Sequence, residues 1–272
     1  MQAAELIALL VPLTFLVMLA VEKLRPARSY PARRGWTWLG IGFLLLIGAV
    51  STLVPLAVDA EWLAAHRLVD GSGLGVAGGT LAGYFVLSGT MYLVHRSFHA
   101  VPLLWRLTHQ LHHSPQRVDI PGSVLFHPVE MVLQVVLQLL VTLLVLGLDP
   151  LAAALTGYVA AFYGMFQHWN IRTPRWLGYL IQRPEAHNEH HRLGVHAHNY
   201  GDLPLWDLLA GTFRNPQHFE GRCGFESPAD RRLGAMLGFV DVNAVAYGSG
   251  SRGAMHEPAA CGRGADIGAA SR

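Results

Sequence analysis

The sequence predicts an all-α protein, a polytopic membrane helical bundle of about four to five membrane helices with a helical cap at one end. Of its 272 residues, 52% are hydrophobic and only 14% are charged, whereas soluble domains usually carry about 25% charged residues. Long apolar stretches recur as far as Phe166, and histidine-rich segments follow several of them. These features favour a bundle embedded in a bilayer over a soluble domain.

Five apolar stretches are candidates for the membrane helices: Leu6–Val21, Trp36–Val58, Leu74–Val94, Val129–Leu148 and Leu151–Phe166. A helix needs about 20 apolar residues to cross the hydrocarbon core, with a range of about 17 to 25. The middle three stretches meet this length, whereas the first and fifth are short enough to be tilted, partial or interfacial. The fourth and fifth meet at the turn Gly147–Pro150 and are expected to form a helical hairpin.

Basic residues predict the orientation of these helices. Five Lys or Arg lie between Glu22 and Gly35, one (Arg67) between Asp59 and Gly73, and three between His95 and Pro128. Because cytoplasmic loops carry an excess of Lys and Arg, the N-terminus is expected outside and every histidine-rich segment on the cytoplasmic face. The first residues lack the basic region of a cleavable signal peptide, so we expect the first helix to be retained.

Nine of the fifteen histidines stand in three clusters and one isolated position. The pattern reads His95-x-x-x-His99, His109-x-x-His112-His113, His168 and His187-x-x-His190-His191. On a helix, residues three and four apart share a face, and imidazole is the commonest protein metal ligand. Each cluster could thus offer two or three nitrogens to one point. Nine nitrogens exceed the four positions of a tetrahedral zinc site, so the sequence predicts a di-metal site held by the cytoplasmic cap.

Four further residues are candidates for additional ligands or for contacts from outside the ligand shell: His127, His196, His198 and Asp207. The carboxylates of Asp207 and Glu130 could orient ligating histidines. Ordinary structural roles are favoured for both acids. Asp207 would cap a helix that starts near Leu208, and Glu130 would lie in the first turn of a helix, where negative charge is favourable.

The order and spacing of the three clusters resemble those of the sterol desaturase/fatty acid hydroxylase superfamily of membrane di-iron enzymes. Other segments resemble motifs of that superfamily: His127-Pro128-x-Glu130, His168-x-Asn170, Asn199-Tyr200-Gly201, Leu205-Trp206-Asp207 and Gly211-Thr212-Phe213. The resemblance covers about residues 80–214. One departure is that the fatty acid 2-hydroxylases of the superfamily have a paired box where this chain has His168 alone.

The resemblance implies two iron ions as cofactors, O2 as co-substrate, and hydroxylation or desaturation of an unactivated C–H bond in a membrane lipid. It also implies a division into N-terminal membrane helices (1–73), a catalytic domain (74–214) and a tail (215–272), whose Gly/Ala/Ser-rich end is expected to be disordered. The chain has no cytochrome b5-like His-Pro-Gly-Gly segment. Electrons are therefore expected from an external donor, either a ferredoxin or a cytochrome b5-like protein with its reductase, and no nucleic acid partner is expected.

Several alternatives stay open at this point. A carotenoid hydroxylase would use related histidine boxes, and a relative that binds metal without turnover would keep the same residues. A membrane metal transporter should hold ionisable ligands near the bilayer midplane, but the predicted spans are nearly free of ionisable residues. The match of Gly73-x-Gly75-x-x-Gly78 to a dinucleotide fingerprint opens a membrane helix, where small residues favour close helix packing instead.

Overall fold

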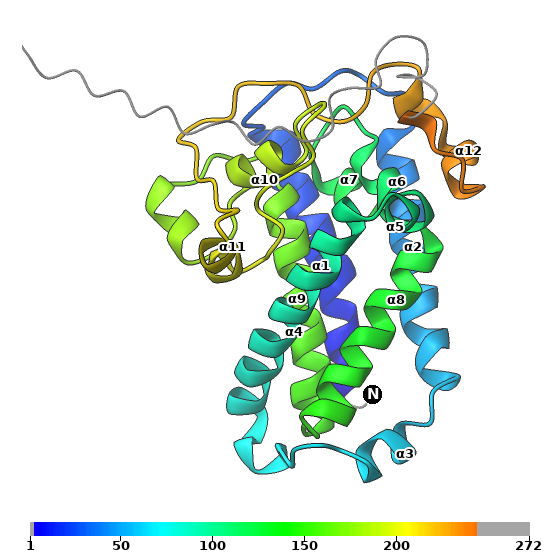
Figure 1. The fold of residues 1–272 in the computed structure, drawn as a ribbon, viewed down its shortest axis with the longest axis vertical. Helices are drawn as coiled ribbons and strands as arrows, with labels where there is room; N and C mark the ends of the chain where they lie inside the picture. Colours follow the sequence, from blue (N-terminus) through cyan, green and yellow to red (C-terminus); the bar gives the residue numbers. More distant parts are fainter. Residues whose placement is uncertain (1–2, 244–272) are drawn as a thin grey trace, which may run out of the picture.

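A computed structural model describes residues 3–243, and the regular structure of this part of the chain is helical throughout (Figure 1). The all-α prediction is therefore confirmed. The Gly/Ala/Ser-rich end that the sequence predicts to be disordered lies in residues 244–272, outside the described residues. The cysteine Cys261 lies there as well.

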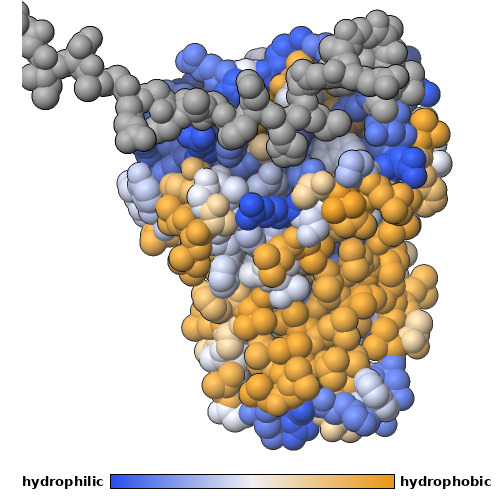
Figure 2. All heavy atoms as spheres, viewed as in Figure 1, coloured by the Kyte–Doolittle hydropathy of each residue, from blue (hydrophilic) through white to orange (hydrophobic). Residues whose placement is uncertain are grey.

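Long helices form an upright bundle (Figure 1). They are α1 (Ala3–Leu24), α2 (Trp36–Leu56), α4 (Gly75–Ala100), α8 (Pro128–Leu139) with its π-helical continuation η3 (Leu140–Val145), and α9 (Pro150–His168). Four segments are long and apolar enough to cross a membrane: Leu6–Leu24, Trp36–Leu56, Ser72–Ala100 and Pro128–Val145. Figure 2 shows the broad apolar surface that these helices present between two hydrophilic ends. The protein is thus an integral membrane protein.

The fifth apolar stretch, α9, lies inside the bundle and packs against α1 and α4. Its first turn is capped by Asp149, whose carboxylate accepts a hydrogen bond of 2.8 Å from the backbone N–H of Leu151. Its hairpin partner α8 packs instead against α2. The hairpin is therefore splayed, and the space between its two arms becomes part of a cavity.

Small residues bring α4 and α9 together. A Cβ atom added to Gly79 would lie 2.9 Å from Cβ of Ala152, and one added to Gly83 would lie 2.4 Å from Oγ1 of Thr156. Such close approach is how membrane helices associate when a hydrophobic driving force is missing. The contact lies just beyond the Gly73–Gly78 segment to which the sequence assigned it.

The short helices gather mainly at one end of the bundle and form the cap (Figure 1). The cap contains α5 (Pro102–Leu104), the π-helical η2 (Trp105–His109), α6 (Gln110–His113), α7 (Ile120–Ser123), η4 (Arg175–Tyr179), α10 (Pro184–His190), α11 (Pro204–Ala210), η5 (Ala229–Arg231) and α12 (Leu233–Leu237). At the opposite end lie α3 (Ala60–Ala65) and η1 (Ser72–Leu74). Within residues 3–243, every Lys and Arg except Arg67 belongs to the cap end.

Buried contacts tie the cap to the first two helices. The hydrophobic core joins Phe15 and Trp36 of those helices to Leu111 and Phe225 of the cap. The indole N–H of Trp36 donates to the buried carboxylate of Asp119 at 2.9 Å. The N-terminal helices and the histidine-bearing part of the chain therefore share one core.

Candidate metal centre

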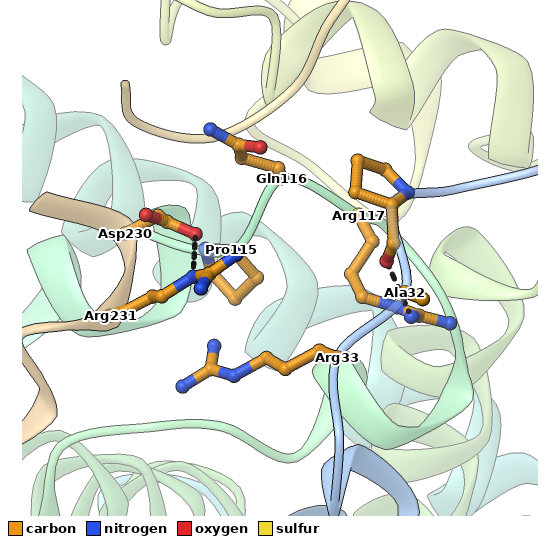
Figure 3. Close-up of a pocket in the computed structure, with 8 residues that line it drawn as sticks. Ala32, Arg33, Pro115, Gln116, Arg117, Asp230 and Arg231 are labelled. Atoms are coloured by element: carbon orange, nitrogen blue, oxygen red, sulfur yellow. Dashed lines mark hydrogen bonds and ion pairs between the residues drawn. The ribbon is translucent and has the colours of Figure 1, made fainter. Parts of the chain in front are cut away.

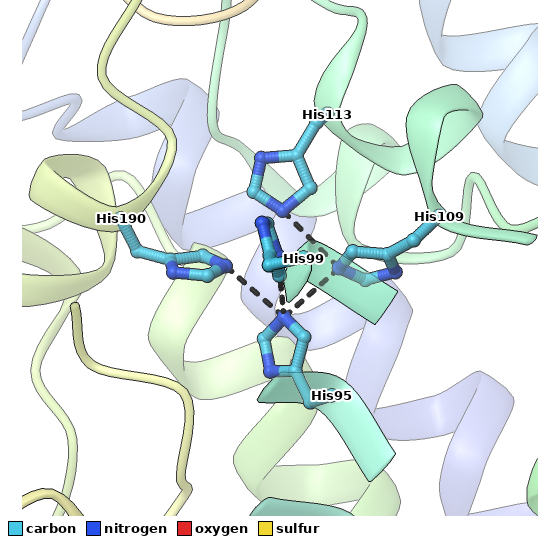
Figure 4. Close-up of side chains that lie close together, drawn as sticks. All are labelled: His95, His99, His109, His113 and His190. Carbon is cyan, nitrogen blue, oxygen red and sulfur yellow. Dashed lines mark hydrogen bonds between the residues drawn. The ribbon is translucent and has the colours of Figure 1, made fainter. Parts of the chain in front are cut away.

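The nine histidines of the sequence pattern come together in two groups. Within each group, one ring nitrogen of every histidine lies within 4.8 Å of the corresponding nitrogens of the others. The five-histidine group contains His95, His99, His109, His113 and His190 (Figure 4), and the four-histidine group contains His112, His168, His187 and His191.

Helical geometry explains how the clusters divide. Residues four apart stay together, as His109 and His113 do in one group and His187 and His191 do in the other. The remaining member of each triplet, His112 or His190, joins the other group, because neighbouring residues on a helix diverge by about 100°. The sequence predicted that each cluster would offer two or three nitrogens to one point; in the structure, two rings of each triplet share one group and the third ring belongs to the other group.

The spacing of the ring nitrogens fits metal ions. Nε2 of His95 lies 2.9 Å from Nε2 of His109 and 3.1 Å from Nε2 of His190. In the four-histidine group, Nε2 of His168 lies 3.0 Å from Nε2 of His112 and 3.2 Å from Nε2 of His187. Two imidazole nitrogens bound to one ion at about 2.1 Å would lie roughly 3 Å apart. A set of converging imidazole nitrogens is therefore a donor set that suits two cations.

Backbone carbonyls fix the orientation of three rings. Nδ1 of His95 donates to the carbonyl of Tyr200 at 2.7 Å, Nδ1 of His168 to that of Gly164 at 2.7 Å, and Nδ1 of His190 to that of His198 at 2.6 Å. A carbonyl oxygen can only accept, so the proton of each neutral ring stays on Nδ1. This leaves the lone pair of Nε2 free for a metal ion.

Glu130 orients a fourth ring. Its Oε1 accepts a hydrogen bond of 2.9 Å from Nδ1 of His109, and its carboxyl group is buried, with 1% of the residue exposed. Oε2 has no hydrogen-bond partner among residues 3–243. Glu130 does lie in the first turn of α8, as the sequence favoured, but the contact with His109 adds the orienting role that the sequence ranked second.

Asp207 acts on the loop before it. Its carboxylate accepts hydrogen bonds from the backbone N–H groups of Tyr200 at 3.0 Å and Gly201 at 2.9 Å, and from Oγ1 of Thr212 at 2.6 Å. Because the helix α11 begins at Pro204, Asp207 lies within it rather than capping a helix at Leu208. Asp207 thus holds the turn whose Tyr200 carbonyl orients His95.

None of the three other candidate histidines belongs to either group. Nδ1 of His196 lies 3.1 Å from Nδ1 of His113, so this ring contacts the five-histidine group from outside. His198 contributes its backbone carbonyl to His190. His127 caps α8 by accepting a hydrogen bond from the backbone N–H of Val129 at 3.2 Å.

Burial keeps the cap histidines neutral. Six of the grouped histidines lie outside the spans and outside α9, and the pKa of each is lowered. The larger cause is burial away from water, and the smaller is the proximity of other imidazoles. The six are His109, His112, His113, His187, His190 and His191. A protonated imidazole has no lone pair to offer, so these lowered pKa values keep the rings in the form that binds metal at neutral pH.

A cavity of about 800 Å³ lies between α1, α2, α4, α8 and α9 and reaches both groups. His95 and His109 of one group and His112, His168 and His187 of the other line its inner end. Along α9 the wall extends from His168 to Ala154, a distance of about 21 Å at 1.5 Å per residue. This depth exceeds half of the hydrocarbon core, which is about 30 Å thick.

The wall of the cavity is mostly apolar, and no Lys or Arg of the described chain lines it. Asp202 is one of its few acidic residues. Oδ1 of Asp202 accepts a hydrogen bond from Nε2 of Gln167 at 2.5 Å, and burial raises the pKa of Asp202 to about 6. Sequence reasoning missed Asp202 and Gln167, because neither belongs to a histidine motif.

Comparison with known proteins places this site in a family. Residues 80–212, which include all nine grouped histidines, match the family model described as fatty acid hydroxylase. The chain belongs to the sterol desaturase/fatty acid hydroxylase superfamily. The superfamily resemblance predicted from residues 80–214 is therefore confirmed.

The relatives of the chain include enzymes that are named for different lipids. The chain is 31% identical over 220 residues to ornithine lipid hydroxylase OlsE of Rhizobium tropici, a match that covers 75% of this chain and 65% of that protein. It is 30% identical over 142 residues to lathosterol oxidase of Homo sapiens, covering 48% and 44%. It is 25% identical over 191 residues to sphinganine C4-monooxygenase 1 of Arabidopsis thaliana, covering 67% and 72%.

The chain thus spans less than two thirds of the length of the first two of these relatives. No solved structure matches the chain.

Proposed function

We propose that the protein is a membrane-bound di-iron oxygenase that hydroxylates or desaturates an unactivated C–H bond of a lipid. The observation that carries this proposal is the apolar cavity inside the membrane bundle, whose inner end is formed by both histidine groups. Its mostly apolar wall would favour the binding of an apolar molecule from the bilayer. The relatives named hydroxylase, oxidase and monooxygenase support an oxygenase over other uses of a histidine centre.

In this proposal the five-histidine group holds one iron ion and the four-histidine group holds the other. Iron at this position would supply the O2 chemistry, which no side chain of the cavity can perform. The protein's own residues have other tasks. Glu130 and the carbonyls of Tyr200, Gly164 and His198 keep the rings in one tautomer, and the apolar wall keeps water away from the reacting carbon.

We propose that the cavity takes the apolar part of the lipid along its length. Its wall runs from the histidines past Val135 and Gly157 to Ile7 and Pro55, near the opposite end of the bundle. A carbon held against His95 and His168 would therefore have the rest of the apolar chain pointing away from the cap. This placement would select one carbon among many chemically similar ones, because position alone distinguishes them.

The external electron donor and the cytoplasmic location of the cap are parts of the same proposal. The cap end carries the arginines that the positive-inside rule assigns to the cytoplasm. Arg33, Arg117 and Arg231 surround a shallow surface hollow there, beside Asp230 (Figure 3). A donor protein with an acidic face, such as a ferredoxin or a cytochrome b5-like protein, would meet complementary charge at this end.

Two alternatives use the same residues. A carotenoid hydroxylase would differ in its lipid, and a metal-binding protein without turnover would differ in its lack of O2 use. A transporter is disfavoured, because the grouped histidines lie in the cap or at the cap ends of the long helices rather than at the middle of the spans.

The test combines metal analysis with isotope labelling of the purified protein in lipid nanodiscs. We expect about two irons per chain, lost in the His112→Ala/His190→Ala double variant and kept in the variant of an exposed histidine, His218→Ala. With a chemical or protein reductant and ¹⁸O2, the loaded protein should add ¹⁸O to a membrane lipid or remove two hydrogens from it. Iron bound without O2 consumption on lipid, sterol or carotenoid extracts would overturn the oxygenase proposal in favour of metal binding alone.

A further inference from the structure

Two segments of the cap present an apolar surface that no described part of the chain covers. In α11, the leucines Leu205, Leu208 and Leu209 are exposed, Leu209 to 73%. In and directly after η4, which contacts α11, the exposed residues are Trp176, Tyr179 and Leu180, Trp176 to 63%. We call these six residues the apolar foot. An exposed cluster of this kind usually marks an interaction surface.

Trp206 fastens the foot to a membrane-spanning helix. Its indole N–H donates to Oγ of Ser88 in α4 at 3.0 Å, and its ring lies 5.0 Å from the ring of Phe85. A Cβ atom added to Gly89 would lie 3.0 Å from the Trp206 ring, so the indole packs directly on the backbone of α4. The position of α11 along α4 is thereby fixed (Figure 1).

The contact lies on the lipid-facing ridge of α4. Leu81, Phe85, Gly89 and Leu93 recur every four residues and so form one ridge of the helix. Leu81 and Leu93, on either side of the Trp206 contact, are 73% and 64% exposed. Because the apolar span Ser72–Ala100 includes all four residues, the ridge faces lipid both below and above the indole.

The charged residues near the apolar foot are either buried or at its edges, as contact with a membrane requires. The single charged residue of α11 is Asp207, which is fully buried and bonded to the Tyr200 turn. Exposed arginines, Arg175 and Arg214, flank the foot, where their side chains can extend to headgroup phosphates. Trp and Tyr are the residues enriched at this depth of a bilayer.

We propose that α11 and η4 are embedded in the membrane leaflet on the cap side, with the apolar foot in contact with lipid. The occupant is a bilayer rather than a protein, because the foot continues the lipid-facing surface of α4 without a break. The cap is therefore a partly immersed structure rather than a soluble lid.

Immersion of α11 would reach the histidines through a short chain of hydrogen bonds. Asp207 of α11 holds the backbone N–H of Tyr200, and the Tyr200 carbonyl accepts the Nδ1 proton of His95. The backbone turn at Tyr200 is thus the only link between the lipid-contacting helix α11 and the proposed metal ligand His95 in this chain of hydrogen bonds. The leaflet would help to hold that turn in place.

Fluorescence quenching of a labelled full-length protein in nanodiscs tests the proposal. Cys261→Ser removes one native thiol, and the other, Cys223, is buried, with its pKa raised by burial to about 12, so it does not react under mild labelling conditions. Leu209→Cys then places an environment-sensitive NBD dye on the foot. Glu226→Cys, at an exposed position of the cap surface, is the matched control.

We expect the dye at position 209 to be quenched by doxyl-labelled lipids and to lose its quenching by iodide in the buffer, while the dye at position 226 shows the reverse. Iodide quenching at position 209 equal to that at 226 would overturn the proposal. So would protection from both quenchers, since that result would mean that a second copy or another protein covers the foot. Neither outcome depends on catalysis, so the result stands apart from the proposed oxygenase activity.

Discussion

Glu130 and His109 join the membrane bundle to the histidine centre. Oε1 of Glu130, in the first turn of α8, accepts the Nδ1 proton of His109 at 2.9 Å, while Nε2 of the same ring lies 2.9 Å from Nε2 of His95. The carboxylate therefore sets which nitrogen of His109 faces its neighbours. None of the described residues that line the cavity with Glu130 is a Lys or an Arg.

Glu130→Leu should weaken iron binding by the five-histidine group by about 10- to 100-fold, because partners that orient metal-bound histidines have effects of this size. The measurement is iron content at graded chelator concentrations, together with the absorption spectrum of the loaded protein. Glu130→Gln should keep the hydrogen bond through its amide oxygen and recover much of the binding. Equal iron retention in Glu130→Leu and the parent protein would contradict the orienting role.

Gly164→Leu should block the cavity while leaving the metal in place. Gly164 lines the cavity one turn before His168, and no atom lies within 4 Å of the position of an added Cβ. A leucine there would occupy space proposed for the lipid, so lipid turnover should fall at least about tenfold. Iron content should remain at the parental value.

The matched control for the blocked cavity is Gly42→Leu, which adds the same side chain to a lipid-exposed position of α2 with open space around it. It should leave turnover unchanged. If Gly164→Leu turned over lipid at the parental rate, the cavity would not be the route to the histidines.

Gly83→Ala should destabilise the bundle. The new Cβ would lie 2.4 Å from Oγ1 of Thr156 and 2.8 Å from Cδ1 of Leu148, and overpacking of this kind costs about 1–3 kcal/mol. Gly78→Ala, five residues earlier, meets nothing closer than Cβ of Leu74 at 3.5 Å and should be neutral. Thermal unfolding in detergent compares the two; equal melting temperatures would show that α4 and α9 can separate without loss.

Asp202→Asn should change how stability depends on pH. Burial raises the pKa of Asp202 from 3.8 to about 6, so the folded protein holds this proton more tightly than the unfolded chain. The stabilising contribution is complete below pH 3.8 and is lost as pH rises through about 6, to a total on the order of 3 kcal/mol. Asparagine can still accept the hydrogen bond from Gln167 but has no charge to bury.

The stability of Asp202→Asn relative to the parent protein should therefore increase between about pH 4 and pH 6 and level off above that. Unfolding curves of both proteins across this range measure the difference directly. A difference that does not vary with pH would show that the carboxyl group keeps an ordinary pKa in the folded protein.

Much of the bundle could be predicted because membrane spans are local in sequence. The apolar stretches that became α1, α2, α4 and α8 are recognisable from length and hydropathy alone. The role of α9 was harder to foresee. Its position between α1 and α4 depends on Gly79 and Gly83 of α4, and a glycine's partner on another helix cannot be predicted from one chain.

The histidines of the site could also be predicted, but not their division into two groups. The spacing of four that joins His109 to His113 was visible, yet His112 could be assigned only once His168 was known to lie 3.0 Å away. The hydrogen-bond partners of the rings are even harder to predict from the sequence. The Tyr200 carbonyl is a backbone atom that any residue could supply, so no sequence pattern marks it as the partner of His95.

Neither histidine group can be completed early in synthesis. The five-histidine group is complete only with His190, and the four-histidine group only with His187 and His191. All three residues are synthesised after the four apolar spans. A chain inserted as far as α9 carries four members of the five-histidine group and two of the four-histidine group, so both groups are still incomplete. If the protein holds two metal ions as proposed, both sites would be completed only after insertion, with the metal supplied from the side of the membrane on which the cap folds.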